Sequence, residues 1–100
     1  MIRFMRSAQS HQGKGDAAAK WAKEVTEYIN SNFPDVNLQV FTNRFGQLNE
    51  ITWMTDTENL ADLDQYQLKV DADKGYMELL AKTEGLFVTG SLEDKVFVSY

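Results

Sequence analysis

The chain has 100 residues, of which 43% are hydrophobic and 25% charged, and its net charge at pH 7 is −5. These values predict one globular domain over residues 1–100 and exclude a disordered or membrane-embedded chain. The pI of about 4.7 disfavours nucleic-acid binding, which needs a basic surface. The absence of cysteine excludes disulfides, thiolate nucleophiles, iron–sulfur ligation and Cys-based zinc sites.

The first residues show no pattern of a targeting segment. Arg3 and Arg6 stand where a signal peptide has an apolar stretch, and no apolar run reaches the roughly 18 to 20 residues of a membrane span. We therefore expect a cytoplasmic protein that does not bind membranes.

The first elements follow from hydrophobic periodicity. Ile2–Ala8 has apolar residues on both parities, which predicts a strand buried on two faces. A turn over Ser10–Gly15 precedes an amphipathic helix that runs from Asp16, its expected N-cap, to about Phe33. Pro34 then ends the helix, because the residue before a proline resists helical geometry.

A hairpin comes next in the chain. Val36–Phe45 alternates between apolar and polar residues and predicts a second strand. Gly46 and Gln47 form the expected turn, and Leu48–Asp56, rich in Ile, Thr and Trp, predicts a third strand with apolar residues on both faces.

The last third of the chain predicts two helical pieces and a strand. Asp56 or Thr57 can cap the first piece, and the pattern breaks over Asp71–Gly75 before it resumes as far as Gly85. Lys95–Tyr100 predicts a fourth strand. The acids between the third strand and the break are interpreted as a solvated helix face, because their spacing does not fit a calcium-binding loop.

This order predicts a ferredoxin-like βαββαβ sandwich of the α+β class, with both helical layers on one face of an antiparallel sheet. The other face of the sheet would then be bare. Since both parities of the first three strands carry large apolar side chains, we expect a second copy to cover the bare face, giving a sheet-to-sheet homodimer.

Several residues carry a resemblance to a known family. They are the hairpin Phe45–Ile51, Leu60, Asp71 or Asp73, Tyr76 and the segment Glu84–Phe87. This pattern resembles the NIPSNAP-like part of the dimeric α+β barrel superfamily. The resemblance implies the same fold and a pocket between the helices and the sheet of each subunit. The wider superfamily includes cofactor-free monooxygenases acting on aromatic polyketides and haem-degrading oxygenases, which implies an oxygenase as one possible activity.

Few side chains offer catalytic or cofactor chemistry. His11 is the only histidine and lies in a predicted turn, where it is either a solvent-exposed residue or a general base at the mouth of a pocket. No Ser-His-Asp arrangement or metal-ligand spacing is present. The haem-degrading members use an asparagine, a tryptophan and a helical histidine, whereas Asn43 and Trp53 are predicted on strands. We expect no metal and no cofactor.

The candidate ligand-binding residues are three cationic or titratable side chains and four aromatic ones: Arg3, Arg6, His11, Trp21, Trp53, Tyr66 and Tyr76. Arg3 and Arg6 point to opposite faces of their strand. At least one of them therefore needs a carboxylate, for which Glu50 is the expected partner, or an anionic ligand.

Three functions remain open. The first is non-catalytic binding of an apolar or fatty-acid-like molecule in a cavity between helices and sheet, lined by adaptable side chains such as Met5, Met54, Met77 and Phe41. If that molecule is a carboxylate, Arg3, Arg6 or His11 would anchor its head. The second is a cofactor-independent monooxygenase or isomerase, which needs a titratable group with a shifted pKa in the cavity. The third is an interaction module, which needs no cavity.

Overall fold

Strands and helices follow one another along the chain in the predicted order. The computed structural model describes all 100 residues. Its elements are β1 (Ile2–Gln9), α1 (Gly15–Asn32), β2 (Gln39–Thr42), β3 (Glu50–Thr57), α2 (Leu60–Asp71), α3 (Lys74–Ala81) and β4 (Glu93–Val98). None of the helices is long and apolar enough to cross a lipid bilayer.

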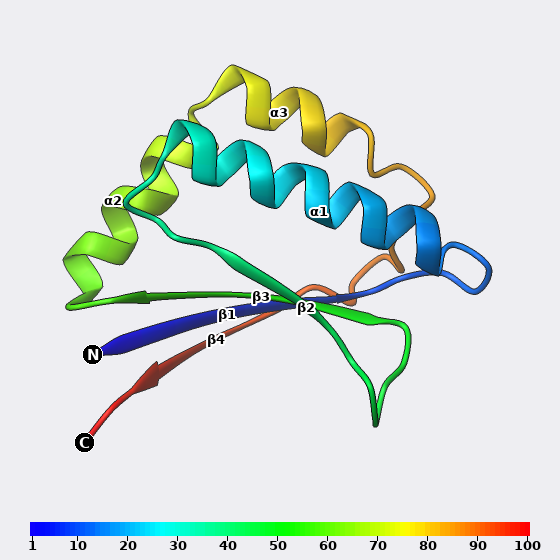
Figure 1. Cartoon of the computed structure of the whole chain (residues 1–100), viewed down its shortest axis with the longest axis horizontal. Helices are drawn as coiled ribbons and strands as arrows, with labels where there is room; N and C mark the ends of the chain where they lie inside the picture. The colour runs from blue at the N-terminus through cyan, green and yellow to red at the C-terminus, as the bar shows by residue number, and fades with distance from the viewer.

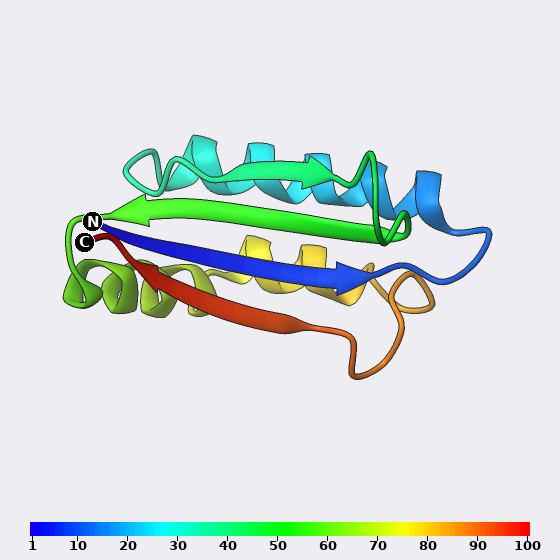
Figure 2. The ribbon, with the colours of Figure 1, turned by 90° about the horizontal axis from the view of Figure 1, so that it is seen from below.

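The strands form one antiparallel sheet in the order β2-β3-β1-β4. All three helices cover the same face of this sheet, and no helix lies on the opposite face (Figures 1 and 2). The predicted ferredoxin-like α+β fold is confirmed. The two central strands, β1 and β3, pair along their whole length, and the chain termini lie side by side (Figure 2).

Helix α1 lies on the sheet through one apolar stripe. Its buried residues recur every three or four positions, as the periodicity predicts: Ala18, Trp21, Ala22, Val25, Thr26 and Ile29. The prediction that Asp16 caps the helix is wrong. The helix begins at Gly15, Lys14 takes the N-cap position without a side-chain hydrogen bond, and Asp16 lies in the first turn, where a carboxylate interacts favourably with the helix dipole.

Strand β2 is much shorter than the predicted Val36–Phe45, because a side chain takes its first backbone hydrogen bonds. The amide of Asn30 on α1 accepts from Leu38 N at 2.7 Å and donates to Leu38 O at 2.8 Å. Leu38 is thereby tied to the helix instead of the sheet. At the other end, the strand stops at Thr42, and a loop replaces the predicted tight turn.

The break between α2 and α3 lies where the sequence predicts it. The caps differ: Asn59 caps α2 by accepting from Asp62 N, whereas Asp56 and Thr57 still belong to β3. Asp73 caps α3 by accepting from Tyr76 N at 2.9 Å. Helix α3 ends at Ala81, four residues before the predicted stop at Gly85.

Alternation along the strands gives the sheet two different faces. The helix face buries Phe4, Ile51 and Trp53. The outer face carries the intervening residues, among them Met5 and Met54, which are direct cross-strand neighbours. Apolar residues on both faces were predicted, and the register confirms them.

The α2–α3 break is fixed against α1 by one tyrosine. The Tyr28 hydroxyl donates to Asp73 Oδ2 at 2.6 Å. The ring passes directly over Gly75, where an added Cβ would lie 2.0 Å from the Tyr28 hydroxyl oxygen. Any side chain at position 75 would therefore force the Tyr28 ring to move, which favours glycine although this position lies inside a helix.

We predict that Gly75→Ala lowers the free energy of unfolding by about 1–3 kcal/mol, because the methyl group forces Tyr28 off Asp73. Gly15→Ala is the matched control. It also lies in the first turn of a helix, but nothing lies within 4 Å of its added Cβ. Urea denaturation should show Gly15→Ala neutral or stabilising, since alanine favours helix. Equal stability of the two variants would contradict the role given to Gly75.

Candidate functional site

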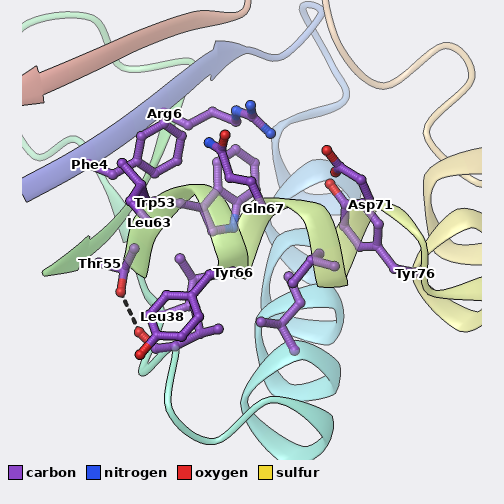
Figure 3. Close-up of a pocket in the computed structure, with 13 residues that line it drawn as sticks. Phe4, Arg6, Leu38, Trp53, Thr55, Leu63, Tyr66, Gln67, Asp71 and Tyr76 are labelled. Carbon is purple, nitrogen blue, oxygen red and sulfur yellow. Dashed lines mark hydrogen bonds between the residues drawn. The ribbon is translucent and has the colours of Figure 1, made fainter. Parts of the chain in front are cut away.

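Two adjoining cavities lie between the helices and the sheet. The first, here the α2 cavity, has a volume of about 120 Å³ and lies between α2 and the sheet, with Leu63, Tyr66 and Val70 of α2 in its wall (Figure 3). The second, the α3 cavity, has a volume of about 360 Å³ and is bounded by Leu80 of α3 and by Phe87. Both are mainly apolar. The residues common to their walls are Arg6, Ile29, Trp53, Asp71 and Tyr76.

An aromatic cluster forms the rigid part of the α3 cavity. Trp21 meets Trp53 edge to face, with ring centroids 6.1 Å apart, and meets Phe87 at 5.6 Å. Trp21 Nε1 donates to Leu79 O at 2.8 Å, and Trp53 Nε1 donates to Thr26 Oγ1 at 3.2 Å. Because both indole groups are hydrogen-bonded, their rings are fixed and the cavity is preformed.

Arg6 provides the positive charge of the site and already has a carboxylate partner. Its Nε and Nη2 donate to the two carboxylate oxygens of Asp94 on β4, at 2.7 and 2.9 Å. Its guanidinium also lies over the ring of Phe4, 5.4 Å from the centroid. The hydrogen bonds to Asp94 raise the pKa of Arg6. The guanidinium is therefore charged, oriented and largely neutralised within the chain.

Asp71 and Tyr76 flank Arg6 from the helical layer. Figure 3 shows their side chains next to each other, where α2 ends and α3 begins. Tyr76 is buried, and this burial raises the pKa of its hydroxyl. Asp71 is exposed and lines both cavities. Its negative charge contributes to raising the pKa of Arg6 and of Tyr76. Arg6, Asp94, Asp71 and Tyr76 are here called the polar end of the cavities.

The structure brings together five of the seven predicted ligand-binding residues. Arg6, Trp53 and Tyr76 line both cavities, Trp21 lines the α3 cavity, and Tyr66 lines the α2 cavity. The other two lie elsewhere, Arg3 on the outer face of the sheet and His11 in the exposed turn before α1.

The expected partner of the arginines is wrong. Arg3 binds Asp56 in a bidentate pair at 2.8 and 3.0 Å, and Arg6 binds Asp94. Glu50 faces Gln9 in the register and accepts from Asn43 instead. It is three positions along β3 from Trp53, the cross-strand neighbour of Arg6, so its distance along the strand excludes the pair.

The methionines predicted to line the cavity do not line it. Met5 and Met54 lie on the outer face of the sheet together with Phe41, because they have the opposite parity to Phe4 and Trp53. Met77 is exposed on α3. Sequence reasoning missed several lining residues, among them Asp71, Leu80 and Phe87. Helical spacing from Tyr76 was a signal that could have found Leu80.

No group of three or more His, Asp or Glu side chains is placed to hold a metal ion. The two cavity-lining groups with displaced pKa values, Arg6 and Tyr76, are both displaced upward, away from neutrality.

Solved structures share this fold over the whole chain. An uncharacterised NIPSNAP domain protein from Burkholderia xenovorans superposes with a TM-score of 0.83 at 16% identity, covering 100% of this chain and 95% of that one. A NIPSNAP family protein from Agrobacterium tumefaciens gives 0.82 at 19% identity, covering 99% and 92%. An antibiotic biosynthesis monooxygenase gives 0.71 at 10% identity, covering 100% and 99%.

No model of a protein family matches the chain, and no curated protein matches it in sequence. The resemblance to NIPSNAP family proteins is thus confirmed at the level of the fold, which many functions can share.

The hydrogen bond from Tyr28 lowers the pKa of Asp73 below its usual value of 3.8. A carboxyl whose pKa is lowered by folding stabilises the fold above its unfolded pKa, and this contribution is lost as the pH falls through the folded pKa. We predict that Tyr28→Phe is less stable than the wild type at neutral pH and that the difference shrinks below about pH 4. Denaturation at a series of pH values, with the exposed Tyr100→Phe as control, measures it. A difference independent of pH would contradict the assignment.

Proposed function

We propose that the chain is a non-catalytic binding protein for a small, mainly apolar molecule held in the α2 and α3 cavities. The observation that carries the proposal is the α3 cavity, whose volume of about 360 Å³ lies within the roughly 300–1,000 Å³ of typical ligand pockets. Its wall is mainly apolar, and its charged residues are Arg6 and Asp71. The adjoining α2 cavity gives room for a few more atoms of the same guest.

The enzyme alternative has less support in the side chains. A cofactor-independent oxygenase or isomerase needs a base in the cavity that is active near neutral pH. Burial keeps the hydroxyl of Tyr76 protonated, and the guanidinium of Arg6 stays charged beside Asp94. The likeness to an antibiotic biosynthesis monooxygenase is a likeness of fold.

The binding proposal is tested with N-phenyl-1-naphthylamine, a neutral probe that fluoresces in apolar sites. Leu80→Trp fills part of the α3 cavity, whereas Leu68→Trp makes the same change on the exposed side of α2. We predict that Leu80→Trp weakens probe binding about tenfold or more and that Leu68→Trp leaves it unchanged. Equal binding by the two variants, or no binding by the wild type, would refute the proposal.

We also propose that the protein acts as a homodimer that buries the outer face of the sheet. An apolar patch crosses this face diagonally and consists of Phe41, Met54, Met5 and Phe97, one residue from each strand. Phe41 and Phe97 are 45% and 47% exposed. The charges beside the patch are paired within the chain, Arg3 with Asp56 and Lys95 with Glu93. Such a self-neutralised apolar face suits a second copy around a two-fold axis.

Light scattering at micromolar concentration should then give about twice the chain mass of 11.4 kDa. Met54→Lys puts a charge in the centre of the patch and should give the monomer mass, because that charge would be buried without a partner. Met77→Lys makes the same change on the exposed side of α3 and should stay dimeric. A monomeric wild type would refute the dimer.

A further inference from the structure

The polar end of the cavities carries an excess of one negative charge. The charged side chains in the two cavity walls are Arg6 and Asp71, and Asp94 pairs with Arg6. One guanidinium thus stands against two carboxylates. Because Asp94 neutralises Arg6, the charge that a guest meets is that of Asp71.

Asp71 has free hydrogen-bonding capacity. Its carboxylate forms no salt bridge, and no side chain or backbone amide of the chain donates to it, whereas Asp94 and Asp73 are each bonded. It lies beside the hydroxyl-bearing ring of Tyr76, at the edge of both cavities (Figure 3). A donor on a guest molecule would find an acceptor here without breaking a bond of the protein.

A carboxylate guest fits this end poorly. To reach Arg6 it would have to displace Asp94 from two hydrogen bonds of 2.7 and 2.9 Å, leaving Asp94 without its partner and placing a further anion near Asp71. The negative charges of the guest and of the two aspartates would repel one another. The fatty-acid-like molecule expected from the sequence is therefore disfavoured by its head group, although its tail suits the cavity.

A cationic guest fits on two independent grounds. Asp71 is an unpaired acceptor, and the cavity walls hold the aromatic side chains of Trp53, Tyr66 and Tyr76, a residue type that favours cations. The net charge of −5, to which Asp71 contributes, also attracts cations from solution. We propose that the ligand of this site is an apolar amine whose ammonium group binds Asp71 and whose apolar part fills the cavities. This inference rests on the binding function proposed above.

The test uses three probes that share one eight-carbon chain: octylamine, 1-octanol and octanoate. At neutral pH they are cationic, neutral and anionic, so their order reports the charge that the site prefers. Each displaces N-phenyl-1-naphthylamine from the wild-type protein. We expect octylamine to bind most tightly and octanoate most weakly, with about a tenfold span. Octanoate binding as tightly as octylamine, or no displacement by octylamine, would overturn the proposal.

Variants of the polar end separate charge from shape. Asp71→Asn keeps the size of the side chain and should weaken octylamine about twofold to fivefold, the scale of an exposed ion pair, while 1-octanol changes little. Asp64→Asn makes the same substitution at an exposed position of α2 outside both cavities and should leave octylamine unchanged. An equal effect of the two variants would mean that only the net charge matters and would overturn the role of Asp71.

A third variant narrows the preference for the cation. Asp94→Asn removes the partner of Arg6, so octanoate should bind about twofold to fivefold more tightly than to the wild type. No gain for octanoate would contradict the charge balance described here. If the wild type bound none of the probes, N-phenyl-1-naphthylamine included, the binding function itself would be refuted, so the two failures are distinguishable.

Discussion

The register between the two central strands decides how the two faces of the sheet are used. β1 and β3 pair so that Arg6 lies opposite Trp53 and Met5 lies opposite Met54. Since side chains alternate between faces, Arg6 and Trp53 line the cavities under the helices, whereas Met5 and Met54 form the centre of the outer apolar patch. A slip of one residue would exchange the two sets. The candidate binding site and the proposed dimer surface are therefore two consequences of one pairing.

The order and number of the elements could be predicted because periodicity reports burial, and burial decides this fold. The ends of the elements could not, because they depend on single side chains that bond the backbone. Asn30 takes the hydrogen bonds of Leu38 and shortens β2. Asn59 caps α2 because the residues before it, up to Thr57, are held in β3, where Thr57 faces Ile2. Such competition between local bonds is invisible to a pattern of apolar residues.

The aromatic and apolar part of the site was predictable for the same reason as the fold, since Trp21, Tyr66 and Tyr76 follow helical spacing. Of its charged groups, Arg6 was predicted but the two carboxylates around it were not. Asp71 belongs to an acidic stretch that predicts a solvated helix face, and only the end of α2 brings it to the cavities. Asp94 precedes the predicted last strand, so its pairing with Arg6 depends on a β1–β4 register that the sequence alone leaves open.

The side-by-side termini have a consequence for the order of folding. Ile2 faces Val98, and Ser99 N donates to Met1 O, so β1 and β4 join residues that are almost a full chain length apart. Closing so long a loop costs entropy before any contact repays it. Until the last strand docks, Arg6 lacks Asp94, the carboxylate that accepts both of its side-chain hydrogen bonds. The charge arrangement of the candidate site is thus complete only after β4 has paired with β1, the pairing of longest sequence separation in the sheet.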